Sequence, residues 1–371
     1  MNLFKGFICH PTVCCVEDNY QIMIPVKYKM LVSVRVGNKE YFNHSNGIRL
    51  SDPKIQRVTV PMSELDREKK YTVICRRMIL RRAYGSITGK IQEIEYKFKP
   101  LTKTENINIY HIADTHSHIS PAVEAAEKYG KEIDLLILNG DIAGTSETVK
   151  EISVAYRIAS DITKGTIPCI ISRGNHDLRG KCAPILAEYM PNSNGKSYYT
   201  IKVGCIWAIL VDSGEDKPDD HPEYGNTVAC HQFREEETEY ICDVIKNDEY
   251  NNPDFKYRLV ISHVPFSYKV GPSPFDIEQD LFRKWCSILK DNVKPNLMLC
   301  GHMHYSAISE IGSEHDSYGQ PCTVLIGSIM KKHKKDSKTY FAGMGLELNE
   351  NKVTVTFNTR NEILEVNEID V

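Results

Sequence analysis

The sequence contains no long uninterrupted apolar segment. None of its apolar runs approaches the roughly 18 residues that a membrane-spanning helix needs. The first residues, MNLFKGFICHPTVCC, also lack the continuous apolar stretch of a secretory signal peptide. These absences predict a cytoplasmic protein without a membrane partner.

An excess of positive charge is missing as well. The 371 residues carry 46 Lys and Arg against 49 Asp and Glu, so the formal net charge is −3. Proteins that bind nucleic acid polymers usually carry a strong basic excess. The composition therefore argues against a nucleic acid polymer as a partner, and the 41% hydrophobic content is that of an ordinary globular protein.

The twelve cysteines show no regular framework. Many lie inside apolar stretches such as IPCIIS, VGCIWAIL and LMLCGH. Buried cysteine behaves as a small hydrophobic residue, and a chain without an export signal stays in a reducing compartment. We therefore predict free thiols rather than disulfides.

Short alternating runs fill the first hundred residues. In QEIEYKFKP, the apolar Ile94, Tyr96 and Phe98 alternate with charged residues, which is typical of a half-buried strand. MLVSVRVGNKEYF predicts two strands joined by a turn, IQRVTVP and YTVICRRMIL two more, and RRMILRR places arginines on an outer strand face. We predict a β-sandwich domain over residues 1–100.

From residue 101 onward, strands alternate with helices. NINIYHIAD, IDLLILNGD and TIPCIISRGNHD predict strands, whereas PAVEAAEKYGK after Ser120, SETVKEISVAYRIASDITK and APILAEYM predict helices. The later strands SYYTIKV, CIWAILVD, YRLVISH, NLMLCGH and CTVLIGS precede a terminal hairpin. This alternation predicts an α/β domain over residues 101–371 with helices covering its sheets.

Five of these strands end in side chains that can bind metals. The stretches are HIADTH, LLILNGD, CIISRGNHD, LVISH and LMLCGHMH. Because loops at the carboxyl ends of strands converge on one crevice in α/β sheets, five such ends favour a single site.

Taken singly, each stretch has an ordinary structural explanation. Asn139-Gly140 is a common turn, the Asn and Asp of GNHD can cap a helix, and a lone His263 is typical of a buried core histidine. His111 is expected in the core, on the side opposite Asp114. It is the order of the five stretches that favours a functional site.

That order, D-x-H, GD, GNHD, a lone His after a strand and GHxH, resembles the calcineurin-like metallophosphoesterase family over residues 105–357. The resemblance implies a two-sheet β-sandwich flanked by helices and a site for two metal ions. It assigns Asp114, His116 and His304 to one metal, Asn175, His263 and His302 to the other, and Asp141 to both. His176 is implied to be catalytic beside the substrate phosphate.

The implied chemistry is hydrolysis of a phosphomonoester or phosphodiester by in-line attack of a metal-bound hydroxide. Nitrogen and oxygen ligands without thiolate suit Mn, Fe, Zn or Ni, and the sequence does not choose among them. Asp177 and His118 are candidates for supporting a metal ligand from behind, and His118 also for contacting substrate. A small or medium-sized phosphate ester is the expected substrate.

Departures from known branches narrow the resemblance. Gly144 stands where purple acid phosphatases need a tyrosine and where protein phosphatases carry an arginine motif. Residues 41–73 nevertheless look like the fibronectin type III-like domain that precedes certain metallophosphoesterases. The acidic segment 214–225 is expected to be a solvated loop, and KKHKKDSK a basic surface loop.

Three other functions stay open. The first is a nuclease of the same superfamily, and the second is a catalytically silent scaffold that keeps the fold. In the third, the N-terminal domain is a glycan- or protein-binding module that sets the target. The same domain could also mediate oligomerisation.

Overall fold

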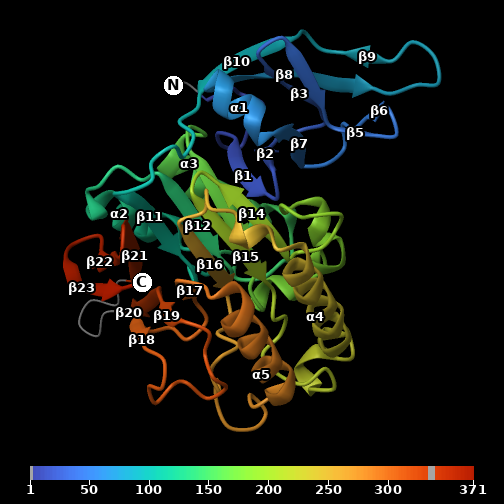
Figure 1. Ribbon diagram of the computed structural model, residues 1–371. Helices are drawn as coiled ribbons and strands as arrows, with labels where there is room; N and C mark the ends of the chain where they lie inside the picture. The colour runs from blue at the N-terminus through green and yellow to red at the C-terminus, as the bar shows by residue number, and fades with distance from the viewer. Residues whose placement is uncertain (1–2, 333–338) are drawn as a thin grey trace.

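The computed structural model describes residues 3–332 and 339–371. Most of the predicted basic loop KKHKKDSK lies outside these residues. Within them, two large sheets carry the predicted α/β region and a further antiparallel sheet lies at the N-terminal end of the molecule (Figure 1). No helix in the described part of the chain has the length and apolarity to cross a bilayer.

The strands follow the predicted runs closely. Before residue 101 they are β1 Thr12–Val16, β2 Asn19–Pro25, β3 Met30–Val36, β4 Lys39–Phe42, β5 His44–Ser45, β6 Ile48–Arg49, β7 Ile55–Pro61, β8 Lys70–Leu80, β9 Ile87–Thr88 and β10 Gln92–Lys97. After it they are β11 Ile107–Ile112, β12 Leu135–Asn139, β13 Pro168–Ser172, β14 Tyr199–Val203, β15 Ile206–Val211, β16 Tyr257–Ser262, β17 Leu297–Cys300, β18 Ala307–Ser309, β19 Thr323–Ile326, β20 Ile329–Lys332, β21 Thr339–Asn349, β22 Lys352–Thr359 and β23 Ile363–Asp370.

The α-helices are α1 Met62–Glu68, α2 Ile119–Tyr129, α3 Val149–Thr163, α4 Cys230–Asn247 and α5 Gln279–Ile288. Helix α3 shows why a predicted helix begins where it does. The Thr148 side chain accepts a hydrogen bond from Glu151 N, and the Glu151 carboxylate accepts one from Thr148 N. This reciprocal capping satisfies backbone donors that have no partner within the helix.

Two sheets face each other in the α/β region. The first has the order β23-β22-β21-β11-β12-β13-β1-β2-β7, and the second β14-β15-β16-β17-β19-β18. Strands β11, β12 and β13 are parallel in the first sheet, and β15, β16, β17 and β19 in the second. The predicted architecture of two sheets flanked by helices is confirmed.

Three hydrophobic clusters define the layers. One cluster lies between the two sheets. The first sheet contributes Ile137 and Ile170 to it, and the second contributes Ala208 and Leu210. A second packs α2 and α3 on the first sheet, and a third packs α4 and α5 on the second. The order of layers is therefore helix, sheet, sheet, helix.

The N-terminal strands differ from the prediction of a separate sandwich ending at residue 100. Strand β1 pairs in parallel with β13, with Cys14 opposite Cys169, so β1, β2 and β7 extend the first sheet. All five residues of β1 are buried, which is typical of an interior strand rather than of a strand with one solvated face. Strands β10-β8-β3-β4, with β9 beside β8, form a separate sheet, and β5 pairs with β6 in a two-stranded ribbon.

Two smaller predictions were also wrong, and one strand was missed. Helix α2 begins at Ile119 rather than after Ser120, and Ala183–Glu188 forms a 3-10 helix with non-helical backbone at Ile185. Strand β23 was not expected, because its side chains are mostly exposed and its sequence lacks an apolar face.

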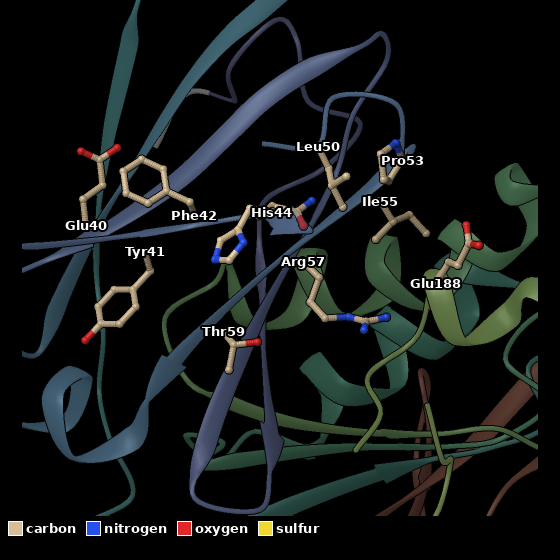
Figure 2. Close-up of a pocket in the computed structure, with 11 residues that line it drawn as sticks. Glu40, Tyr41, Phe42, His44, Leu50, Pro53, Ile55, Arg57, Thr59 and Glu188 are labelled. Carbon is tan, nitrogen blue, oxygen red and sulfur yellow. The ribbon is translucent and has the colours of Figure 1, made fainter. Parts of the chain in front are cut away.

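A cavity of about 820 Å³ lies where the N-terminal strands meet the α/β region (Figure 2). Phe42 and His44 line it from one side, and Glu188 from the other. Arg57 of β7 crosses this junction and donates hydrogen bonds to the carbonyl oxygens of Ala187 and Met190, at 2.8 Å for Met190. Hydrogen bonds of Arg57 thus join the two parts of the chain beside this cavity.

We predict that a variant lacking residues 1–100 will not fold stably. Its loss exposes the edge of β13 and one side of the cluster between the sheets. Far-ultraviolet circular dichroism and urea unfolding of residues 101–371 test this, with replacement of the exposed turn 82–86 by glycines as the control. A cooperative unfolding transition at full-length stability would contradict it.

Candidate active site

The predicted metal ligands all follow the carboxyl ends of strands β11, β12, β13, β16 and β17. Several of them adopt the left-handed backbone conformation that non-glycine residues rarely use: Asp114 (φ 52°), His116 (φ 42°), Asp141 (φ 52°), His302 (φ 65°) and His304 (φ 54°). Such backbone clusters at functional sites, where surrounding structure holds it. Asp114 and His116 thus reach the site from a turn beyond the end of β11.

Asn139, at the end of β12, joins the two sheets beneath the site. Its Nδ2 donates to the carbonyl oxygen of Leu299 at 3.0 Å and to His111 Nε2 at 3.1 Å, and lies 3.3 Å from the carbonyl oxygen of Ser262. Its Oδ1 accepts from Ser172 Oγ at 2.7 Å. The turn predicted at Asn139-Gly140 is therefore also a polar clamp between the layers.

Asp114, His116 and His304 form the first group of ligand atoms. All three lie within 4.8 Å of one another, with His304 Nε2 3.3 Å from both Asp114 Oδ1 and His116 Nε2. Asp114 is fully buried, whereas the His304 side chain is 51% exposed. This is the group that the sequence assigned to one metal.

Asp141 and His263 form the centre of the site. His263 Nδ1 donates to the carbonyl oxygen of Asn139 at 2.7 Å, which directs the Nε2 atom towards Asp141 Oδ2 at 3.3 Å and Asp114 Oδ1 at 3.7 Å. Burial would lower the pKa of His263, but Asp141 and Asp114 outweigh burial and raise it to about 10.

Two buried atoms of this centre, Asp114 Oδ1 and His263 Nε2, make no hydrogen bond in the described structure. A buried polar atom without a partner is costly, and the two cations that the resemblance implies would satisfy these atoms, one held by Asp114 and the other by His263. The donor set therefore fits a metal ion.

Asn175 and His302 lie on the other side of Asp141. One terminal atom of the Asn175 amide is 3.2 Å from both Asp141 Oδ2 and His302 Nδ1. In one orientation of the amide this atom is nitrogen, which donates hydrogen bonds to Asp141 Oδ2 and His302 Nδ1. In the other orientation it is oxygen, and three atoms with lone pairs (Asn175 Oδ1, Asp141 Oδ2 and His302 Nδ1) then face one another. A cation would select the second orientation, since all three atoms then offer it electrons.

Glycines allow the strand ends to approach this closely. A Cβ at Gly174 would collide with Asp141 Oδ1, and a Cβ at Gly140 would collide with the His263 ring. The glycines of GD and GNHD are therefore required by the site's packing.

His176 lies at the rim of the site. Its backbone N–H donates to Asp141 Oδ1 at 2.9 Å, and its Nδ1 donates to the carbonyl oxygen of Gly144 at 3.1 Å. Because Nδ1 makes the second contact, the other ring nitrogen, Nε2, is free. It lies 4.0 Å from Asp141 Oδ2, and the His176 side chain is 34% exposed. This nitrogen can meet a substrate.

Asp177 supports Asp141 rather than a histidine. Its Oδ2 accepts hydrogen bonds from the backbone N–H groups of Gly174 at 2.8 Å and Asp141 at 3.2 Å. Burial and the neighbouring Asp141 raise the pKa of Asp177 to about 7. The carboxylate thus ties the GNHD turn to the GD turn.

The remaining histidines of HIADTHSHI, His111 and His118, lie outside the two ligand groups. His111 is fully buried and contacts Asn139, as predicted for a core residue, and burial lowers its pKa to about 3. His118 is exposed at the start of α2, and its Nδ1 contacts only the carbonyl oxygens of Thr115 (3.0 Å) and His116 (3.1 Å). The structure does not bring His118 to the ligand atoms.

Sequence reasoning missed two carboxylates that follow β15, Glu215 and Asp216. Both are buried, so the prediction of a solvated loop is wrong for this part of the segment 214–225. Glu215 Oε2 is 3.5 Å from Asn175 Nδ2, and Asp216 Oδ2 is 3.7 Å from His302 Nε2. Each carboxylate thus stands behind one ligand of the same group.

Cations hold these carboxylates in place. Arg179 binds Glu215 through two hydrogen bonds of 2.7 and 2.8 Å, and Lys217 pairs with Asp216 at 2.8 Å. The Tyr224 hydroxyl lies 3.0 Å from Glu215 Oε2 and 3.2 Å from Asp216 Oδ1, so it can donate its one hydrogen to either acid. The only signal in the sequence is the position of GED directly after a buried strand.

A cavity of about 710 Å³ opens beside this network. Leu178 and Arg179, which directly follow His176 and Asp177, form part of its wall, and Pro184, Val228 and Phe233 give it an apolar side. This volume is in the range of small-molecule binding pockets.

Comparison with known proteins agrees with this geometry. The model of the family described as "Calcineurin-like phosphoesterase" matches residues 107–306, more than half of the chain. No curated protein sequence matches the chain significantly.

Two solved structures are similar over nearly the whole chain. A purple acid phosphatase from yellow lupin (Lupinus luteus) seeds aligns with a TM-score of 0.60 and 11% identity, over 98% of this chain and 74% of that one. PhoD aligns with a TM-score of 0.58 and 10% identity, over 100% and 90%. These likenesses concern the fold.

The chain belongs to the calcineurin-like phosphoesterase family. Its fold is the metallophosphoesterase fold, with mixed α/β sheets and an additional antiparallel sheet region. The family and the convergent ligand groups together support a phosphoric ester hydrolase that binds metal.

We predict that Asn139→Ala will lower the free energy of unfolding by about 3 kcal/mol. The substitution leaves the buried carbonyl oxygen of Leu299, His111 Nε2 and Ser172 Oγ without their partner, and each such loss costs about 1–3 kcal/mol. Urea unfolding measures the change, with the exposed Asn361→Ala as the control. Equal stability of the two variants would contradict the clamp.

We predict that Asp216→Asn will weaken binding of one Mn²⁺ ion by about 10- to 100-fold. The carboxylate faces His302, and partners of that kind orient a ligand and increase its basicity. Titration calorimetry of the metal-stripped protein measures the affinity, and the exposed Asp220→Asn is the matched control. Unchanged affinity in Asp216→Asn would refute the assignment.

Proposed function

We propose that the protein is a dinuclear-metal phosphoesterase that hydrolyses a small or medium-sized phosphomonoester or phosphodiester. The observation that carries the proposal is the convergence of buried, unpaired ligand atoms around Asp141, with a partly exposed histidine at the rim.

The two groups around Asp141 would hold the metals. Asp114, His116 and His304 form one group, and Asn175, His263 and His302 the other. When bound, two cations would lower the pKa of a water molecule and offset the charge that develops on the phosphoryl oxygens. The nitrogen and oxygen donors suit Mn, Fe, Zn or Ni.

The protein's own residues orient and protonate the substrate. With Nδ1–H held by the carbonyl oxygen of Gly144, His176 directs Nε2 into the open side of the site. When protonated there, it would hydrogen-bond a phosphoryl oxygen or give its proton to the leaving oxygen. Asp177 holds the backbone of Asp141 and so keeps the two turns in register.

Exposure defines the side from which substrate enters. His304 and His176 are 51% and 34% exposed, whereas Asp114, Asp141 and His263 are almost fully buried. The phosphate would therefore approach between His176 and His304. The neighbouring 710 Å³ cavity supports an organic leaving group of moderate size, and the net charge of −3 favours such a group over a polymer.

Cytoplasmic location remains part of the proposal. All twelve cysteines are free, and ten of them are buried, which is typical of a chain kept in a reducing compartment.

The key test compares His176→Ala with Asp114→Asn. We expect His176→Ala to lower kcat on an aryl phosphate mono- or diester by about 10²- to 10⁴-fold while keeping its bound metal, because it removes only the proton donor. Asp114→Asn should lose both metal and turnover. Metal content by plasma mass spectrometry and steady-state kinetics on Mn²⁺-loaded protein provide the readouts.

His44→Ala, an exposed histidine in the N-terminal region, is the control and should keep full turnover. Hydrolysis unaffected by His176→Ala would refute the catalytic role, and a wild-type protein that binds metal but hydrolyses no ester would indicate the silent scaffold. Cleavage of single-stranded DNA in preference to small esters would indicate a nuclease.

A further inference from the structure

Residues 76–91 form a hairpin arm that extends beyond the N-terminal sheet (Figure 1). The end of β8 pairs with the short strand β9, with Met78 opposite Thr88 and Leu80 opposite Ile87, across a shifted register. The turn 81–87 is exposed throughout. Figure 1 shows this turn at the far end of the molecule from α2 and β21–β23.

The arm carries positive charge only. It contains Arg76, Arg77, Arg81, Arg82 and Lys90 and no acidic residue, so its formal charge is +5 in a chain of net charge −3. The rest of the chain therefore carries −8. None of these five cations forms a salt bridge with an acid in the described structure.

Two of these cations contact residues outside the arm. Arg77 lies over the Tyr28 ring at 5.1 Å, and Arg81 Nη2 donates to the carbonyl oxygen of Arg49 at 2.7 Å. Arg82 and Lys90 are exposed, and neither side chain makes a hydrogen bond within the described residues. The charge is thus presented to solvent on an anchored hairpin.

Large apolar side chains share the arm with these cations. Tyr84 at the turn is 91% exposed, Ile79 57%, Ile91 53% and Ile87 44%. Scattered exposed apolar residues are ordinary, but several on one projecting hairpin mark an interaction surface.

We infer that the arm binds the surface of a membrane containing anionic lipids. Basic side chains attract anionic headgroups, and an aromatic ring and aliphatic side chains at a projecting tip can enter the interface. Proteins that bind nucleic acids by base stacking use several aromatic rings, and the arm offers only Tyr84 among aliphatic side chains. Contact between the arms of two copies would bring two charges of +5 together. The negative remainder would keep the rest of the molecule away from such a surface.

This arm changes two sequence expectations. RRMILRR was placed on an ordinary outer strand face, yet it runs from the end of β8 into the exposed turn of the arm. The prediction of no membrane partner rested on the lack of a spanning segment, and that lack does not bear on a surface-bound arm.

Vesicle co-sedimentation of the full-length protein tests the inference. We expect binding to phosphatidylcholine vesicles that contain phosphatidylserine, loss of binding with added salt, and little binding to phosphatidylcholine alone. Arg82→Ala with Lys90→Ala should weaken binding about 30-fold, at about tenfold per 1.4 kcal/mol and about 1 kcal/mol per cation. Tyr84→Ser should weaken it several-fold.

Lys128→Ala on α2 and Ile363→Ser on β23 are matched exposed substitutions outside the arm and should bind like the wild type. Three outcomes would overturn the inference: equal binding to both vesicle types, equal loss in the controls, or binding of an RNA oligonucleotide without vesicle binding. Tyr84-dependent dimerisation in light scattering without vesicle binding would do the same. Unchanged ester hydrolysis and circular dichroism in the arm variants show that they fold.

Discussion

The hydrogen bonds of Asn139 are the contact on which the site depends most. The Asn139 side chain joins β12 of one sheet to β17 of the other, and the backbone carbonyl oxygen of Asn139 orients the His263 ring. Asp141 lies two residues beyond this point. Because the ligand-bearing strand ends belong to two separate sheets, a fixed distance between the sheets is needed before any ligand geometry can be maintained. A buried, largely satisfied polar group sets that distance more narrowly than apolar packing alone.

Around this clamp, the protein holds an arrangement that is unfavourable without a cation. Left-handed backbone at Asp114, Asp141 and His302 and two unpaired buried atoms all oppose folding. They persist because the surrounding sheets, the hydrogen bonds of Asp177 and the Arg179–Glu215 pair fix the turns from outside. The stability of the packed layers thus compensates for the strained backbone and unpaired atoms of the site, as is common in enzymes.

The sequence was sufficient to predict the layers and the convergence of the candidate ligand side chains, because both follow from local patterns. Apolar strands that end in Asp, Asn or His identify themselves, and parallel strands bring their ends together. The pairing of β1 with β13 was not predictable from such patterns, since it joins segments about 150 residues apart. A sign was nevertheless present, because TVCCV lacks the alternation of a strand with one solvated face.

Glu215 and Asp216 were missed for a related reason. A loop rich in charge is normally solvated. The ion pairs with Arg179 and Lys217 offset the free energy that burying two adjacent carboxylates costs, and the sequence does not show that these cations lie nearby. The turn that carries Asp114 and His116 was not predictable either, because strand β11 ends at Ile112 and both residues adopt left-handed backbone. Positions in turns depend on backbone conformations that composition does not reveal.

The most direct test of the central claim is anomalous X-ray diffraction from crystals grown with Mn²⁺. We expect two manganese peaks, both beside Asp141, one among Asp114, His116 and His304 and the other among Asn175, His263 and His302. A single peak, or peaks elsewhere with these side chains hydrogen-bonded only to one another, would contradict it.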